Sequence, residues 1–209
     1  MTINLIEKLQ KNKVLPIIRS KDPQDVVNKA YALLEGGLDV MEINVESPQV
    51  FNAIKAISND AIVCAGGIIT SMQFDAAIDS GAKLISSPIF QKSLLKMTKD
   101  KRLPYIAGTS TANEAYNAWK SRIPLIKLFP TDAMGGVQYI EDILRQMPFL
   151  NLMPMGNIKL GDAVTYIKAG ATAVGIGRDF YNGFTPKEIT NRTREILLEI
   201  KDYTKWSQK

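Results

Sequence analysis

The sequence predicts an α/β fold, a (β/α)8 barrel of the TIM type with one extra helix at its N-terminus. Three observations lead to this prediction. Short apolar runs typical of buried strands alternate eight times with helical stretches along the 209 residues. The connections are short and the composition does not shift, so residues 1–209 are expected to form a single domain. An open doubly wound sheet is the competing fold, but the first strand–helix turn lacks the Gly-x-Gly-x-x-Gly motif of dinucleotide-binding domains.

Local signals mark the ends of the predicted elements. Asp22 and Pro23 form an N-cap followed by a proline at the first helical position, and Gly37 ends that helix. Ser47 and Ser93 are expected to cap the helices after the second and fourth strands. Strands are predicted at residues 14–19, 40–45, 61–68, 83–88, 103–108, 125–130, 151–155 and 173–177. Helices are predicted to begin near residues 1, 22, 47, 72, 93, 111, 136, 160 and 186.

The composition is that of an ordinary globular protein, with 45% apolar and 22% charged residues. No apolar run approaches the ~20 residues that a membrane span needs, and the N-terminus does not read as a secretory signal. The single Cys64 lies in an apolar run, so it is expected to be a core residue and cannot form a disulfide within the chain. A reducing cytoplasm is therefore the expected location.

The chain contains no histidine, which removes most metal sites and the Ser-His and Cys-His nucleophile pairs. Acid–base chemistry would fall to Asp, Glu, Lys, Tyr or water, and no metal or cofactor is predicted. The formal net charge of +5 is compatible with a small anionic substrate, with a nucleic acid or with no charged partner. No basic run is interleaved with aromatic residues, so nucleic-acid binding is not expected.

Lys127 is the centre of the predicted site. It lies within the apolar run Leu125–Pro130, which reads as a buried strand that Pro130 closes. An ammonium group inside such a strand is costly unless it is paired or neutralised. The loop at residues 131–136 follows, so Lys127 is placed near the carboxyl end of its strand, where parallel α/β folds keep their catalytic groups. The alternatives without chemistry are a lysine that reaches solvent and one that is ion-paired for structure.

The alternation of side chains along strands predicts a partner for this lysine. Glu42 shares a strand face with Val40 and Asn44, whereas the opposite face is apolar throughout and should contact the helices. Glu42 and Asn44 are therefore expected to point into the barrel. Arg19 ends the first strand in the same way, with a charge after an apolar run. These residues predict a lysine, a glutamate and an arginine near the barrel mouth, a combination that concentrates at catalytic sites.

Glycines follow the last two strands, at Gly156-Asn157 and at Gly175-Ile-Gly177-Arg178. In barrels, the loops after strands seven and eight commonly bind a phosphate through backbone N–H groups, because glycine permits close approach. Arg178 could add a bidentate contact. These loops are the predicted phosphate site.

Three segments together resemble one known family, the 2-keto-3-deoxy-6-phosphogluconate/4-hydroxy-2-oxoglutarate aldolases. They are Gly37-Leu-Asp-Val-Met-Glu42, Ile126-Lys127-Leu-Phe-Pro130 and Ala133-Met-Gly135-Gly. The resemblance covers about residues 14–180. It implies a homotrimer of (β/α)8 barrels and a class I aldolase that works through a covalent imine on Lys127, with Glu42 as the acid–base carboxylate and no other cofactor.

The resemblance also implies roles for the surrounding residues. Those expected to contact the substrate are Arg19, Asn44, Gly66, Gly67, Pro88 and Phe129. Those expected to hold its phosphate are Gly156, Asn157, Gly177 and Arg178. The implied reaction cleaves a 2-keto-3-deoxy-6-phospho sugar acid, of gluconate or galactonate type, to pyruvate and glyceraldehyde 3-phosphate.

The chain departs from the phosphogluconate pattern at several positions. Glu46 stands where the family has an arginine that helps to hold the substrate carboxylate, and Gly67 and Met155 replace threonines. The runs Glu46-Ser-Pro-Gln49 and Gly177-Arg-Asp-Phe-Tyr181 look more like the phosphogalactonate branch. Two alternatives stay open from the sequence: an aldolase for another 2-keto acid such as 4-hydroxy-2-oxoglutarate, and a non-catalytic phosphosugar-binding barrel.

Overall fold

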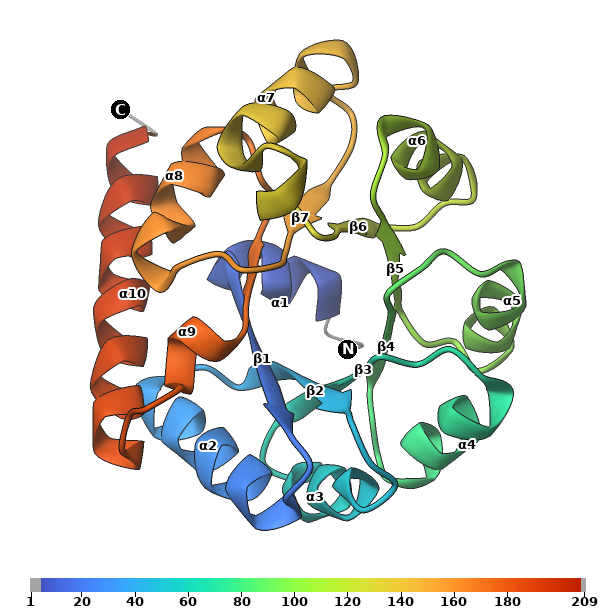
Figure 1. The fold of residues 1–209 in the computed structure, drawn as a ribbon, viewed down its shortest axis with the longest axis vertical. Helices are drawn as coiled ribbons and strands as arrows, with labels where there is room; N and C mark the ends of the chain where they lie inside the picture. The colour runs from blue at the N-terminus through green and yellow to red at the C-terminus, as the bar shows by residue number, and fades with distance from the viewer. Residues whose placement is uncertain (1–4, 208–209) are drawn as a thin grey trace.

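The computed structural model describes residues 5–207 and confirms the predicted barrel. Eight parallel strands form one sheet in the order β7-β6-β5-β4-β3-β2-β1-β8, and helices surround it (Figure 1). A bridge between Met155 and Gly175, with a hydrogen bond from the Thr172 N–H to the Leu152 carbonyl, joins β7 to β8 and closes the ring. The strands are β1 (Val14–Ser20), β2 (Val40–Val45), β3 (Ile62–Gly66), β4 (Leu84–Ser87), β5 (Tyr105–Thr109), β6 (Leu125–Leu128), β7 (Leu152–Pro154) and β8 (Val174–Ile176).

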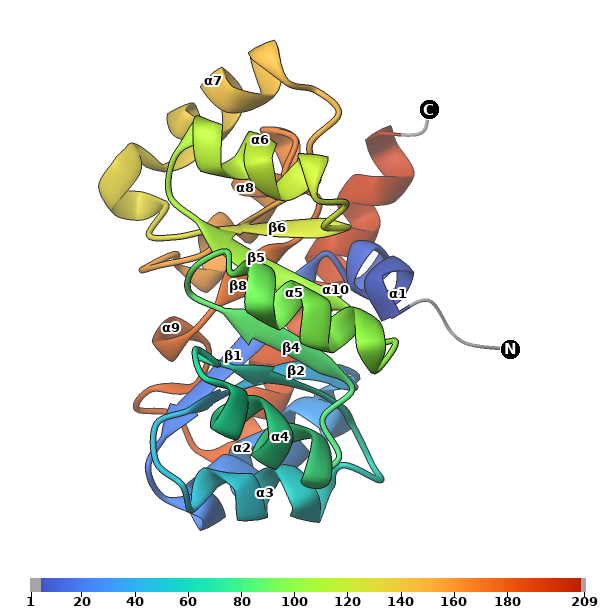
Figure 2. The same cartoon turned by 90° about the vertical axis from the view of Figure 1, so that its right-hand side faces the viewer.

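The helices lie around the outside of the barrel, apart from the first, which lies at one end of it (Figures 1 and 2). They are α1 (Leu5–Asn12), α2 (Pro23–Gly36), α3 (Val50–Ile57), α4 (Ser71–Asp79), α5 (Lys92–Asp100), α6 (Ala112–Lys120), α7 (Gly136–Gln146), α8 (Ala163–Lys168), α9 (Arg178–Tyr181) and α10 (Pro186–Ser207). Two short 3-10 helices lie at Asp132–Met134 and Leu160–Asp162. Within residues 5–207, no helix combines the length and the hydrophobicity that crossing a membrane requires.

The apolar core has two layers, as strand alternation predicts. One layer lies between the strands and the helices and includes Ile126 and Leu128 of β6. The other fills the barrel interior and includes Leu125 of the same strand. Side chains of α1 also join this interior layer, because Ile6 and Leu9 are buried there. Figure 2 shows α1 at one end of the barrel, so the extra N-terminal helix closes that end and leaves the other for a site.

Two of the predicted helix starts are confirmed in detail. The Asp22 side chain accepts a hydrogen bond from the Gln24 N–H at 3.0 Å, and Gly37 ends α2 with a φ of 104°. Thr111 and Glu114 form a reciprocal capping box at the start of α6. These caps satisfy backbone donors that a helix start would otherwise leave unpaired.

The caps predicted at Ser47 and Ser93 are wrong. The chain makes a turn at residues 47–49 before α3 begins at Val50, and the Ser47 hydroxyl donates to the Lys21 carbonyl instead. Ser93 lies inside α5, which begins one residue earlier at Lys92. Serine also bonds to neighbouring backbone groups in turns, so its presence alone does not fix a helix boundary. The short helix α9 was not predicted, because four residues are too few for a helical pattern.

Candidate active site

Lys127 lies inside the barrel, as predicted, on the short strand β6. Only 4% of its surface is exposed. Its Nζ atom lies 3.2 Å from Oε1 of Glu42 and 3.3 Å from Oγ of Ser86. On the neighbouring strand β5 its register partner is Gly108, where a Cβ atom would lie 2.1 Å from the Pro88 carbonyl oxygen. These two polar contacts position the buried amine. Among the described residues, Glu42 is its one charged partner.

Glu42 is fully buried on β2. One of its carboxylate oxygens contacts Lys127, and the other has no hydrogen-bond partner among the described residues. Gly66, on the next strand, makes room for this carboxylate, because a Cβ atom there would lie 2.3 Å from Oε1 of Glu42. The pair is thus a desolvated acid and a desolvated amine, and the acid retains one free oxygen.

Cys64 lies beside this pair on β3, where it is the register partner of Glu42. It is fully buried, as predicted for a core residue. Burial raises the pKa of the Cys64 thiol well above its usual range, and the Glu42 charge adds to this effect while the Lys127 charge opposes it. The thiol therefore stays protonated near neutral pH and is a poor nucleophile.

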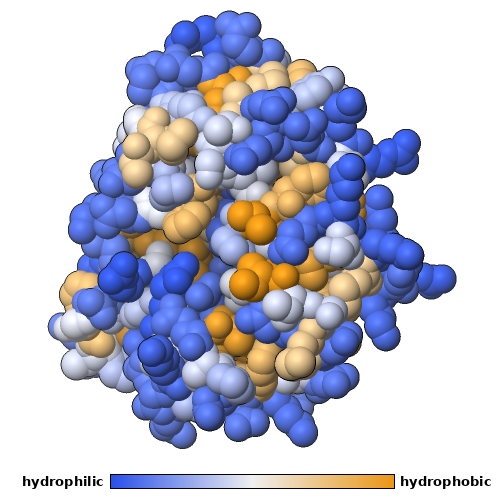
Figure 3. All heavy atoms as spheres, turned by 45° about the vertical axis from the view of Figure 1, so that its right-hand side comes forward, coloured by the Kyte–Doolittle hydropathy of each residue, from blue (hydrophilic) through white to orange (hydrophobic). Residues whose placement is uncertain are grey.

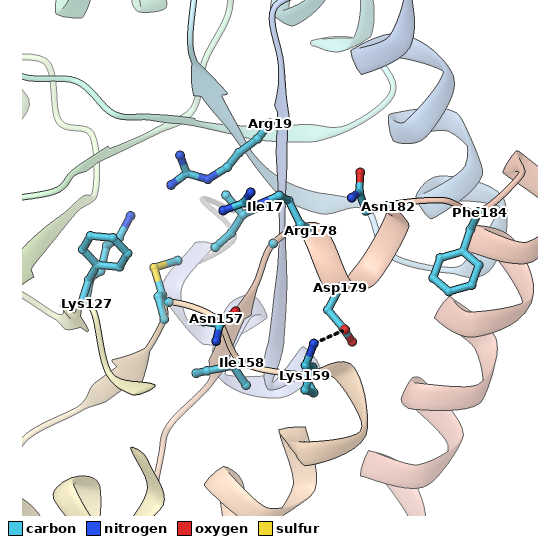
Figure 4. Close-up of a pocket in the computed structure, with 14 residues that line it drawn as sticks. Ile17, Arg19, Lys127, Asn157, Ile158, Lys159, Arg178, Asp179, Asn182 and Phe184 are labelled. Atoms are coloured by element: carbon cyan, nitrogen blue, oxygen red, sulfur yellow. Dashed lines mark ion pairs between the residues drawn. The ribbon is translucent and has the colours of Figure 1, made fainter. Parts of the chain in front are cut away.

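A cavity of about 570 Å³ opens above Lys127 (Figure 4). Met155 and Phe129 line it together with Lys127, and Ile17 lines it from β1. The loops after β7 and β8 lie across the cavity from Lys127, with Lys159 and Asp179 joined by an ion pair of 3.3 Å. The predicted site residues that line the cavity are Arg19, Lys127, Phe129, Gly156, Asn157, Gly177 and Arg178.

The predicted phosphate site is rich in cations. Arg178 begins α9 directly after Gly177, and Lys159 lines the same cavity from the loop after β7, with its amine on Asp179 (Figure 4). Asn157 has a φ of 57°, and its side-chain amide donates to Asp132 at 2.9 Å, which fixes the loop. Asp179 accepts a hydrogen bond from the Leu160 N–H at 2.8 Å, which links the segments after β7 and β8. These contacts place two positive side chains and two glycines at one end of the cavity.

Asp179 is held in its charged form. Partial burial raises its pKa, but the hydrogen bond from the Leu160 N–H and the positive charges of Lys159 and Arg192 outweigh this effect and lower the pKa below its usual value. A carboxylate with a lowered pKa stabilises the fold above its unfolded-state pKa, and this stabilisation is lost as the pH falls through the lower, folded-state value. The anchoring of these two loops is therefore complete at neutral pH and weakens only in acid.

Beside Arg178 at the cavity rim, Glu46 engages Arg19, the cation that was predicted to bind substrate (Figure 4). Nη1 of Arg19 lies 3.2 Å from Oε1 of Glu46, and the Asn44 amide donates to the same oxygen at 3.4 Å. The backbone N–H of Arg19 donates to the buried hydroxyl of Tyr181 at 2.8 Å, which joins β1 to α9. Glu46 thus orients Arg19 at the rim while reducing its net charge toward an anion.

Several predicted substrate contacts do not line the cavity. Asn44 contacts Glu46, and Gly67 lies against Asn44, where a Cβ atom would come within 2.9 Å of its Oδ1. Gly66 backs Glu42, and the Pro88 carbonyl packs against Gly108. The substrate contacts of all four residues remain predictions. The structure shows that Gly66, Gly67 and Pro88 also pack against neighbouring residues.

Sequence reasoning missed other residues of the site. Ser86 contacts the Lys127 amine and could have been found from its strand, because it shares a face with Leu84 of the interior layer. The remaining residues are in loops, helices or strand positions to which the sequence assigned no role in the site, although Asp179 belongs to the run at residues 177–181. They are Ile17, Ile158, Lys159, Asp179, Asn182 and Phe184. Within residues 5–207, no three His, Cys, Asp or Glu side chains are grouped so that they could hold a metal ion.

Comparison with known proteins gives three kinds of match. The family model described as KDPG and KHG aldolase matches residues 5–192. A 2-dehydro-3-deoxy-phosphogluconate aldolase of Haemophilus influenzae is 30% identical over 169 residues, which cover 79% of this chain and 80% of that protein. A 2-dehydro-3-deoxy-6-phosphogalactonate aldolase of Escherichia coli is 27% identical over 173 residues, covering 80% and 84%.

Among solved structures, a KDPG aldolase of Legionella pneumophila superposes with a TM-score of 0.83 and 24% identity, over 94% of this chain and 99% of that one. That structure contains pyruvate captured at low pH as a covalent carbinolamine intermediate. The likeness shows that the two chains share this fold.

Proposed function

This chain belongs to the KDPG and KHG aldolase family, and from that premise we propose that it cleaves a 2-keto-3-deoxy-6-phospho sugar acid of the gluconate or galactonate type. The products are pyruvate and glyceraldehyde 3-phosphate. The observation that carries the proposal is the buried contact of 3.2 Å between the Lys127 amine and the Glu42 carboxylate, at the base of a cavity lined by cations. The non-catalytic barrel that the sequence left open is not favoured, because the relatives are named as aldolases.

The chemistry is that of a class I aldolase, with Lys127 as the nucleophile and no further cofactor. Glu42 is the nearest base to Lys127 and takes a proton from the ammonium, after which the neutral amine adds to the 2-keto carbon. Glu42 returns that proton to the hydroxyl of the carbinolamine, which leaves as water, so a protonated imine forms and Glu42 is again a carboxylate. The captured carbinolamine of the Legionella pneumophila protein supports this step by analogy.

The protonated imine then accepts the electron pair of the C3–C4 bond as that bond breaks, and an enamine forms. Glu42 takes the proton of the C4 hydroxyl, and the aldehyde leaves. A proton returned by Glu42 to C3 regenerates the imine, and hydrolysis releases pyruvate and free Lys127. The free oxygen of Glu42 is the site at which these protons are held.

The cations at the cavity rim suit the anionic groups of the substrate. Arg178, Lys159 and the glycines after β7 and β8 surround the phosphate end. Arg19 contacts the carboxylate or a hydroxyl of the substrate. This contact is weakened because Arg19 is also paired with Glu46.

The proposal is tested by the cleavage of defined substrates. Purified protein is given the gluconate epimer, the galactonate epimer and 4-hydroxy-2-oxoglutarate, and pyruvate formation is followed with a lactate dehydrogenase assay. We expect one phosphorylated epimer to have the highest kcat/KM. Absence of pyruvate from both phosphorylated epimers would refute the proposal, and a higher kcat/KM for 4-hydroxy-2-oxoglutarate would correct the substrate.

Arg178→Ala is expected to raise KM for the phosphorylated substrate about tenfold while kcat changes little, because one charge-assisted contact to the phosphate is lost at an exposed position. The steady-state kinetics of the variant give this measurement. Lys187→Ala, an exposed cation on α10 that does not line the cavity, is the matched control and should leave KM unchanged. An unchanged KM in Arg178→Ala would place the phosphate elsewhere.

We also propose that the chain forms a homotrimer in the cytoplasm. The family resemblance supports the trimer, and the exposed apolar side chains Ile69, Met72 and Ile89 offer an interface near the ends of β3 and β4. Figure 3 shows apolar side chains gathered on one face of the molecule. Light scattering is expected to give about three times the 23.1 kDa of one chain. Ile89→Asp is expected to lower that mass, and a monomeric mass for the unmodified protein would contradict the proposal.

A further inference from the structure

We propose that Ser86 is a further catalytic residue, which accepts the N–H of the protonated imine and thereby releases Glu42 for proton transfer. This inference rests on the function proposed above. Ser86 is fully buried on β4, and its hydroxyl oxygen lies 3.3 Å from the nitrogen atom that reacts.

The number of protons on that nitrogen carries the inference. The ammonium form of Lys127 has three N–H donors, enough for Glu42, Ser86 and the open cavity. When the imine forms, two of these protons leave with the keto oxygen as water, and the nitrogen keeps one. That single N–H has two acceptors within reach, Oε1 of Glu42 at 3.2 Å and Oγ of Ser86 at 3.3 Å.

Glu42 is required elsewhere at this stage. It must take the C4 hydroxyl proton and later return a proton to C3, and a carboxylate engaged with the imine nitrogen is less free to turn toward these positions. A buried donor without an acceptor is costly, so the imine N–H needs a partner while Glu42 acts. Ser86 is the second acceptor in contact with Nζ, so it can hold the N–H through both steps.

The adjacent Ser87 provides a matched control. It is equally buried and lies on the same strand, but it faces outward, where its hydroxyl accepts from the Ile89 N–H and the Gln91 side chain at 3.4 Å. Ser87→Ala removes the same atom from the same strand without touching Lys127. Any general effect of losing a buried hydroxyl from β4 would appear in both variants.

The experiment separates imine formation from the Glu42-dependent proton transfer. The full-length protein and the variants Ser86→Ala, Ser86→Cys and Ser87→Ala are incubated with pyruvate. Borohydride trapping measures the imine, and proton NMR in D2O measures exchange at the pyruvate methyl group. In Ser86→Ala we expect the trapped fraction to stay within about twofold and the exchange rate to fall about tenfold. Ser86→Cys, which keeps the side-chain volume with a weaker acceptor, should lose exchange in the same direction, and Ser87→Ala should retain both.

The outcomes distinguish this inference from the function on which it rests. An unmodified protein that forms no trapped adduct overturns both. Normal trapping and exchange in the unmodified protein with unchanged exchange in Ser86→Ala overturns the role of Ser86 alone. The role of Ser86 is also overturned if trapping in Ser86→Ala falls as much as exchange, or if Ser87→Ala loses as much exchange as Ser86→Ala. A purely structural role would produce those results.

Discussion

Lys127→Met is expected to reduce kcat/KM by about four orders of magnitude or more, because it removes the amine that we propose as the nucleophile. Among the residues that the structure describes, no other lysine or cysteine can replace it, since Lys159 lies across the cavity and the Cys64 thiol is held protonated by burial. The measurement is pyruvate release from the better phosphorylated epimer. Lys83→Met, at an exposed position before β4, is the control and should retain full activity.

The same substitution leaves the Glu42 carboxylate buried without its charged partner. Breaking a buried ion pair in this way costs about 3–5 kcal/mol, so the variant is expected to unfold more readily. The double variant Lys127→Met/Glu42→Gln removes both charges and should recover much of that stability while remaining inactive. Circular dichroism during urea unfolding checks the fold of each variant. Substantial turnover by either folded variant would contradict a catalytic role for Lys127.

Glu42→Gln is expected to lower kcat by about two to four orders of magnitude while the imine with pyruvate still forms. Glutamine has nearly the same shape and can still accept a hydrogen bond from Lys127, but it cannot exchange a proton with the C4 hydroxyl or with C3. The measurement compares the trapped imine with the rate of cleavage in one preparation.

Glu35→Gln, an exposed glutamate on α2, is the control for this variant and should match the unmodified protein. Loss of both the imine and turnover in Glu42→Gln would show that Glu42 acts mainly by holding Lys127 in place. Retention of full turnover would remove Glu42 from the mechanism.

The sequence predicted the centre of the site because strand geometry has a period of two residues. Once Lys127 was assigned to a buried strand, the apolar face of each strand determined which side chains point inward, and Glu42 followed from the same rule. The 3.2 Å contact between residues 85 positions apart confirms that both point inward. The eightfold alternation predicted the barrel in the same way, since each strand and each helix has its own period.

The rest of the site lies in loops, where no such period exists. The ion pair between Arg19 and Glu46 depends on how two strand ends approach each other, and the sequence indicated only that Glu46 is unusual. Lys159 and Asp179 come together because the loops after β7 and β8 meet at one rim. The wrong caps at Ser47 and Ser93 have a related cause, because a serine can satisfy several local arrangements and its neighbours choose among them.

The most direct test of the account is reductive trapping of the unmodified protein with pyruvate and borohydride, followed by intact mass and peptide mapping. We expect one adduct for each chain, on the peptide that carries Lys127. No adduct at saturating pyruvate, or an adduct on any other lysine, would contradict the assignment of this buried amine as the reacting group.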